Sequence, residues 1–148
     1  MGKLIIFLLI MLILTASFVL AVRSVLSPSE LIFNTQEQHL SGVISIETDT
    51  EPLLLSVSPS SDLKNLIDIE PKNNLRVSKN DPLTLKLSII NPQKEVNGLI
   101  TINLLYEKLP KNSNYYGDDT ARIPIKITPN EKTISKISLK FTEEPAPE

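Results

Sequence analysis

The chain of 148 residues contains no cysteine, no tryptophan and only one histidine. Without cysteine it forms no disulfide, attaches no lipid through a thiol, and has neither a thiolate metal site nor a cysteine nucleophile. The single histidine, His39 in TQEQHL, leaves no imidazole cluster for a metal and no partner motif for a nucleophile. Only four glycines are present, widely separated, so there is no phosphate-binding loop. We expect no catalytic residue, no metal and no cofactor, and therefore no enzyme.

Positive charge is also scarce. Once Lys3 and Arg23 are set aside with the N-terminal segment, 13 basic side chains remain against 17 acidic ones, which is a net charge of −4. Nucleic-acid binding depends on dense positive charge. We expect no nucleic-acid partner.

The N-terminal segment differs from the rest of the chain. Leu4 to Val22 is an uncharged run of nineteen residues, which as a helix would reach about 28 Å, the thickness of a bilayer's hydrocarbon core. Lys3 before the run fits either an uncleaved anchor or a signal peptide cleaved after Ala21. The length favours the anchor, because the apolar region of a signal peptide usually has about 7 to 15 residues. Both interpretations place the remaining chain outside the membrane.

Apolar and polar residues alternate beyond this segment, the pattern of strands with one buried face. The clearest runs are Leu83–Ile90 and Ile100–Tyr106, and turn-forming Pro, Asn and Asp residues separate the runs. The side chains predicted to face the core are Ile44, Ile46, Leu53, Leu55, Val57, Ile67, Ile69, Leu83, Leu85, Leu87, Ile89, Ile100, Ile102, Leu104, Tyr106, Ile123, Ile125, Ile127, Ile137, Leu139 and Phe141.

Two local patterns refine this prediction. The segment NPQKEVNG (91–98) joins the two clearest runs and contains Pro92 and Gly98, so we expect the chain to reverse there and the two strands to pair antiparallel. Pro124 lies inside a strand pattern, and its missing N–H places that strand at a sheet edge or a bulge.

The alternating region has the size of one immunoglobulin-like unit, about 100 residues with seven or more strands. The predicted fold is all-β, an immunoglobulin-like antiparallel β-sandwich preceded by one N-terminal transmembrane or signal helix. The predicted boundaries are a membrane anchor or signal segment over 1–23, a linker over 24–30, the sandwich over 31–142 and a flexible acidic tail over 143–148.

One stretch carries a family resemblance. NDPLTLKLSIINPQ (80–93), followed by a second long strand ending in Tyr106, resembles the core hairpin of the CARDB-type immunoglobulin-like modules of bacteria and archaea. The resemblance covers about a quarter of the chain. It implies a surface module used for adhesion or for spacing other domains, and it implies no catalytic residue.

The most suggestive candidate site is the polar stretch EKLPKNSNYYGDD (107–119). Tyr115 and Tyr116 can supply rigid contact area and a hydroxyl to a protein or sugar partner, or can pack on their own sandwich. Asp118 and Asp119 beside them are adjacent acids, which are more often solvated than bound to calcium. We take these four residues as the possible partner contact.

The function expected from these features is that of a membrane-anchored, extracytoplasmic β-sandwich without enzymatic activity. It would be a structural or protein-binding accessory subunit at the cell surface, with the membrane and a protein as partners. The alternative is a secreted module that binds a carbohydrate or another ligand after release by signal peptidase.

Overall fold

The structure is a computed structural model that describes residues 21–27, 30–36, 40–49, 52–90, 95–105, 120–129 and 131–144. All regular secondary structure within these ranges is β-strand. The strands are β1 (Ala21–Ser27), β2 (Leu31–Asn34), β3 (Ser41–Thr48), β4 (Leu53–Pro59), β5 (Ile67–Glu70), β6 (Arg76–Val77), β7 (Leu83–Ile89), β8 (Val96–Leu105), β9 (Thr120–Thr128) and β10 (Lys136–Glu144).

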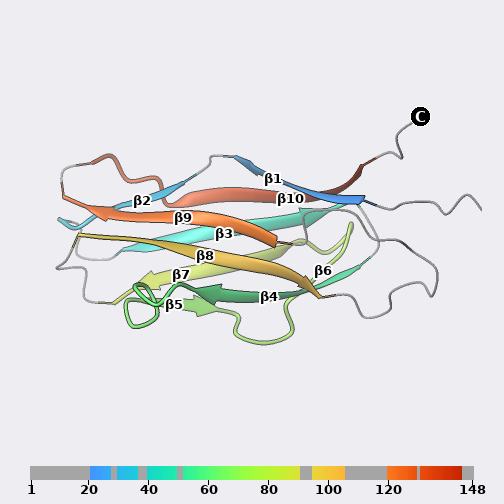
Figure 1. The fold of residues 1–148 in the computed structure, drawn as a ribbon, viewed down its shortest axis with the longest axis horizontal. Coiled ribbons are helices and arrows are strands. Elements are labelled where there is room, and N and C mark those ends of the chain that lie inside the picture. The colour runs from blue at the N-terminus through green and yellow to red at the C-terminus, as the bar shows by residue number, and fades with distance from the viewer. Residues whose placement is uncertain are drawn as a thin grey trace, which may run out of the picture.

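The strands form two five-stranded sheets packed face to face (Figure 1). The first sheet has the order β1-β10-β3-β7-β5, and the second has the order β2-β9-β8-β4-β6. Most neighbours are antiparallel, but β10 pairs with β3 in parallel, and so does β2 with β9. The predicted all-β sandwich is confirmed, while these two parallel pairs depart from the purely antiparallel arrangement that was expected.

The core lies between the two sheets and is built by the alternation seen in the sequence. In β9, Ile123, Ile125 and Ile127 are each at most 1% exposed, whereas Arg122 of the same strand points to solvent. Of the predicted core residues that the structure describes, Val57, Ile69, Leu83 and Ile89 are half-buried and the rest are buried. Tyr106 lies outside the described residues. The core also contains side chains that were not predicted: Leu31, Phe33, Leu40, Leu63, Leu75, Val77 and Ala121.

The start of the sandwich differs from the prediction. Residues 24–30 were expected to be a linker, but Ser24–Ser27 belong to β1, which pairs with β10 along its whole length from Ala21↔Glu144 to Ser27↔Ser138. The prediction missed this strand because most of residues 24–30 are polar. Its side chains nevertheless alternate, since Leu26 packs against the core while Val25 points outward. The predicted N-terminal helix falls mainly on residues 1–20, outside the described residues, and Ala21 to Arg23 are extended strand.

The predicted hairpin between the two clearest runs is wrong. β7 pairs with β3 and β5 in the first sheet, whereas β8 pairs with β4 and β9 in the second. Alternation identifies which side chains are buried but not which strand lies alongside, and the chain from Ile89 to Val96 is long enough to cross the roughly 10 Å between packed sheets.

Pro124 lies in a strand with neighbours on both sides, although the sequence predicted an edge or a bulge. β9 stands between β8 and β2, but β2 begins opposite Ile125, so Pro124 has a paired residue only on the β8 side, at Leu99. The missing N–H of Pro124 is therefore tolerated, because Pro124 lies one position before β2 begins and no strand needs a hydrogen bond from it on that side. At the C-terminus β10 continues through Glu144, so the first two residues of the predicted tail are part of a strand.

The sandwich has two ends, which we call the entry end and the far end. At the entry end β1 begins at Ala21, β10 finishes beside it and β3 finishes at Thr48. β4 starts at Leu53, four residues after Asp49, and its second residue, Leu54, pairs with Leu105 of β8, so the second sheet has the same end there. The far end is the opposite one, where β4 leaves at Pro59 and β8 starts at Val96. Figure 1 shows the strands running along the long axis between these two ends.

Candidate interaction surfaces

The far end is closed by the turn from Ser60 to Leu66, which joins β4 of one sheet to β5 of the other. Ser60 N donates to Leu99 O at 2.8 Å, and Leu99 N donates back to Ser60 Oγ at 3.2 Å. At the other end of the turn, Ile90 N donates to Leu66 O at 2.6 Å. The turn is therefore bonded to β8 on one side and to the end of β7 on the other, and we call it the clasp (60–66).

One buried side chain packs the clasp against β8. Leu63 is fully buried, and it lies against Gly98 of β8, where an added Cβ would overlap Leu63 Cγ and come within 2.8 Å of Ser60 Oγ. Contacts under about 3.0 Å do not occur for real Cβ atoms. Gly98 is thus required by the close approach of the clasp, and not by a reversal of the chain as the sequence suggested.

Two exposed hydrophobic side chains flank the clasp. Ile90 is 56% exposed and Leu99 is 40% exposed, and each of these residues makes a backbone hydrogen bond to the clasp. Single exposed hydrophobics are ordinary on protein surfaces. One stands at each side of the clasp, and the sequence analysis singled out neither, because alternation identifies the face of a side chain but not what lies beside it.

The entry end is built differently. β8 ends at Leu105, which is 48% exposed, and β9 begins at Thr120. Thr120 Oγ1 donates to Asn103 Oδ1 at 3.0 Å, and Asn103 Nδ2 donates to Ser56 Oγ at 3.5 Å. These bonds tie the first residues of β9 to β8 and β4. The segment 106–119 therefore leaves and rejoins the sandwich at the same end at which the chain enters at Ala21.

The predicted contact residues Tyr115, Tyr116, Asp118 and Asp119 lie outside the described residues, and so does His39. Only their anchoring points, Leu105 and Thr120, are placed. The prediction that these residues contact a partner therefore remains a prediction, and what the structure adds is that the segment that carries them is attached at the entry end.

A shallow apolar recess runs along the flank between β4 and β5. It measures about 230 Å³ and is lined mainly by Val57, Ile67, Ile69 and Leu75. Lys72 Nζ pairs with Asp68 Oδ1 at 2.9 Å over its rim, and the hydrogen bond to Asp68 raises the pKa of Lys72. Pairing with another chain is limited here, because the edge strand β5 has only four residues and is followed by Pro71, while β4 lies between β8 and β6 and ends at Pro59.

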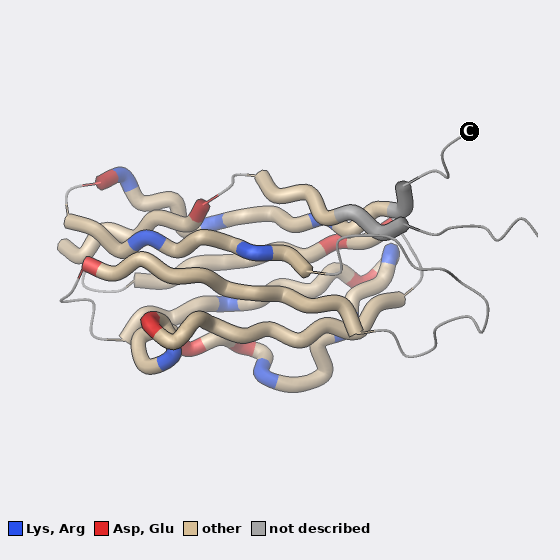
Figure 2. The backbone as a smooth tube through the Cα atoms, in the orientation of Figure 1, with Lys and Arg blue, Asp and Glu red and all other residues tan. Residues whose placement is uncertain are grey.

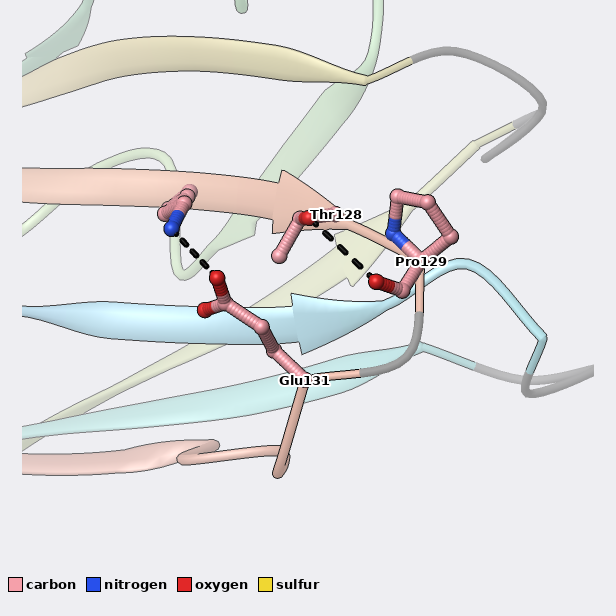
Figure 3. A network of polar contacts seen from close by, with 4 residues as sticks. Thr128, Pro129 and Glu131 are labelled. Carbon is pink, nitrogen blue, oxygen red and sulfur yellow. Dashed lines mark hydrogen bonds and ion pairs between the residues drawn. The ribbon is translucent and has the colours of Figure 1, made fainter.

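Charged side chains are dispersed over the sandwich (Figure 2). Asp49 pairs with Lys140 at 3.2 Å. Lys126 Nζ donates to Glu131 Oε1 at 2.6 Å near the end of β9, where Thr128 Oγ1 also donates to Pro129 O (Figure 3). The pKa of Lys126 is raised by its hydrogen bond to Glu131. Within the described ranges no three His, Asp or Glu side chains come together as a metal site would require.

The part of the chain that the structure describes contains no helix long and apolar enough to span a bilayer. The apolar run from Leu4 precedes that part except for its last two residues, Ala21 and Val22.

Comparison with known proteins identifies the fold. No family model matches the sequence, and no curated protein matches it either. Among solved structures, SSP-19, an MSP-domain protein-like family member of Caenorhabditis elegans, superposes with a TM-score of 0.53 at 11% identity, over 70% of this chain and 97% of that one. The E. coli chaperone DraB superposes with a TM-score of 0.51 at 14% identity, over 77% of this chain and 57% of DraB. The chain is therefore an immunoglobulin-like β-sandwich.

Proposed function

We propose that the chain is a membrane-tethered β-sandwich that stands outside the cytoplasm and acts without enzymatic activity, as a structural or protein-binding accessory subunit at the cell surface. One observation carries the proposal. The last two residues of the apolar run, Ala21 and Val22, are the first two of β1, and the seventeen residues before them, 4–20, still have the length of a short membrane span. A possible span is therefore followed at once by a folded sandwich.

The chemistry of the described surface supports a binding role over a catalytic one. The side chains of Ser56, Asn103 and Thr120 bond to one another across the outer face of the second sheet, and the described ion pairs lie at the surface. Acid–base or nucleophilic catalysis needs a perturbed group in a water-excluding site. The recess between β4 and β5 is shallow and open instead.

Tethering explains how a small module can act. An anchor fixes the sandwich close to the bilayer, which raises its effective concentration toward neighbouring membrane proteins, so that weak contacts suffice. Leu105 and Thr120 carry the segment with Tyr115, Tyr116, Asp118 and Asp119 from the entry end, where such a neighbour is in reach. The chaperone role of DraB and the CARDB-type resemblance, with its implied use in adhesion or spacing, both agree with protein contact.

The anchoring is tested by fractionating cells that express the full chain. We expect the protein in the membrane pellet after alkaline carbonate extraction. Leu12→Arg places a charge at the centre of the run, at a cost of about 2.5–3.5 kcal/mol for insertion, and is expected to deplete the pellet, whereas the control Leu12→Ile is expected to leave it unchanged. Native protein that is extracted into the soluble fraction would contradict the proposal.

The partner contact is tested by crosslinking in native membranes followed by mass spectrometry. Replacing Tyr115 and Tyr116 together by Ala is expected to reduce recovery of the crosslinked partner while leaving the melting temperature nearly unchanged. Replacing both by Phe keeps the rings and serves as the control. A large loss of stability in the Ala variant would show that the tyrosines pack on the sandwich, and the absence of any reproducible partner would contradict the binding role.

A secreted carbohydrate- or ligand-binding module is the second candidate. It is favoured by the position of Ala21, since cleavage after this residue would leave Val22–Ser27 of β1 to pair with β10. Intact-mass measurement of the native protein separates the two candidates, because loss of residues 1–21 removes the tether.

A further inference from the structure

The absence of a spacer between the apolar run and the sandwich fixes which end of the molecule lies nearest to the tether. β1 is paired from its first residue, Ala21↔Glu144, and stays paired through Ser27. No unpaired residues separate the run, which ends at Val22, from the ladder of the first sheet. A flexible linker would allow the domain to change its distance from the membrane and its orientation. A chain that enters a strand directly keeps the entry end close to the membrane in which the run is embedded.

The turn between β6 and β7 shares that end with the tether. It is closed by two backbone hydrogen bonds between Ser78 and Asp81, of 3.0 and 3.1 Å. It belongs to the entry end, because Val77 pairs with Leu53 and Leu83 pairs with Ile46. The far end is separated from it by the length of the strands, and the ten residues of β8 span about 33 Å at 3.3 Å per residue.

The broad faces of the sandwich are poorly suited to lie on lipid. The outer face of the first sheet carries the exposed Glu47, Lys86 and Lys140 together with Val25, and the outer face of the second carries Arg122 and polar side chains together with Leu99 and Leu105. Basic and acidic residues are interspersed over the molecule (Figure 2). A protein that lies flat on a membrane needs an apolar footprint or a basic patch. The exposed hydrophobic side chains of these strands, Val25, Leu99 and Leu105, are separated from one another and form no such footprint, and Leu105 is the one of the two on β8 that lies at the entry end.

We propose that the sandwich stands on its entry end against the lipid surface, with its strands directed away from the bilayer and the clasp (60–66) about 30 Å out. This inference rests on the proposed function, since it requires the apolar run to be embedded. The partner of the entry end is a lipid headgroup layer, and the far end with Ile90 and Leu99 is the surface turned toward the surrounding space.

The tether imposes this contact, and lipid charge contributes little to it. The described entry end has mixed charge, with Lys79 and Asp81 in the same turn and Asp49 paired with Lys140. Neither an anionic nor a neutral lipid is strongly preferred by such a surface. The orientation is therefore expected to persist at high salt.

The lack of cysteine makes a direct test possible, because a single introduced thiol takes a fluorescent label at one known place. Lys79→Cys labels the entry end, and Lys64→Cys labels the clasp; both lysines are exposed, and both changes remove one positive charge. Lys86→Cys and Arg122→Cys label the two broad faces. The full chain is reconstituted into vesicles of neutral lipid doped with a lipid that carries a nitroxide quencher on its headgroup.

We expect the label at position 79 to lose most of its emission in the doped vesicles, and the labels at 64, 86 and 122 to keep most of theirs. A Gly-Ser spacer of about eight residues inserted before Ala21, with a mean reach of about 16 Å, is expected to restore the emission at position 79. The same pattern at high salt would confirm that the tether holds the contact.

The outcomes separate the two proposals. If the protein binds vesicles but its four labels are quenched equally, or the labels at 86 and 122 are quenched most, the proposed orientation on the entry end is wrong. The proposed membrane tether would not be affected by that result. A protein recovered free of vesicles would contradict both the proposed function and the proposed orientation. If the spacer leaves the quenching of the label at position 79 unchanged, that result would also contradict the proposed orientation.

Discussion

The two ends of this sandwich are built in different ways. The far end is closed by the clasp, which bonds to both sheets and buries Leu63 against Gly98. The entry end gathers the chain entry at Ala21, the end of β10 and exposed side chains such as Leu105. The far end is therefore closed by a buried contact, whereas the entry end is where the described chain begins and where the segment 106–119 is attached, at Leu105 and Thr120. Four substitutions test this contrast, and their expected effects decrease in order.

The largest effect is expected from Leu63→Ala. Leu63 is fully buried in the clasp, so its truncation leaves a cavity and should lower the free energy of unfolding by about 2–5 kcal/mol. Urea denaturation followed by circular dichroism measures the change, with the exposed neighbour Lys64→Ala as control. Equal stability of the two variants would show that the clasp does not hold the far end.

Gly98→Ala should come second. The new methyl group overlaps Leu63 Cγ and Ser60 Oγ, and the forced shift is expected to cost about 1–3 kcal/mol of unfolding free energy. Because the overlap is mainly with Leu63, the same change in a Leu63→Ala background should cost less. Additive costs in this double-mutant cycle would contradict the packing of the clasp on β8. Asn97→Ala, at an exposed site beside it, is the control.

A smaller loss is expected from Ser60→Ala. This change removes the acceptor for Leu99 N but leaves the bond from Ser60 N to Leu99 O, so about 0.5–1.5 kcal/mol should be lost. Ser61→Ala, one residue along and exposed, should change nothing measurable. Hydrogen exchange at the Leu99 amide reports the same bond, and unchanged protection there would argue that the bond is not formed in solution.

The smallest effect belongs to the entry end. Asp49→Asn removes the partner of Lys140 in an ion pair whose side chains are 40% and 49% exposed. Solvent screening keeps such a pair below about 1 kcal/mol. Thermal melts at low and high salt should differ little between Asp49→Asn and the native protein. A loss as large as that of Leu63→Ala would break the contrast between the two ends.

Much of the layering was predictable from the sequence, because a period of two residues reports directly on which side chains face inward. Ile44, Leu85 and Ile125 are buried as their runs predict. The clasp was not predictable in this way: Leu63 sits in a polar stretch, SPSSDLKN, with no alternation around it. Likewise β1 was hidden because its residues are partly polar, and only its pairing with β10 shows it to be a strand.

The connections were less predictable than the strands. Nothing in NPQKEVNG distinguishes a reversal within one sheet from a crossing to the other, since both need a polar segment of similar length. The pairing of strands depends on how all inward faces fit together. The contact expected at Tyr115 and Tyr116 depends on a partner, which no property of the chain alone reveals.

The central claim, that the sandwich lies outside the membrane behind an embedded apolar run, is tested most directly by labelling in intact cells. Ser138→Cys places one thiol on the exposed face of β10, in a chain without any other. A membrane-impermeant maleimide is expected to label it fully before lysis, with the labelled protein remaining in the membrane pellet at its full mass. Labelling that occurs only after lysis would contradict the claim.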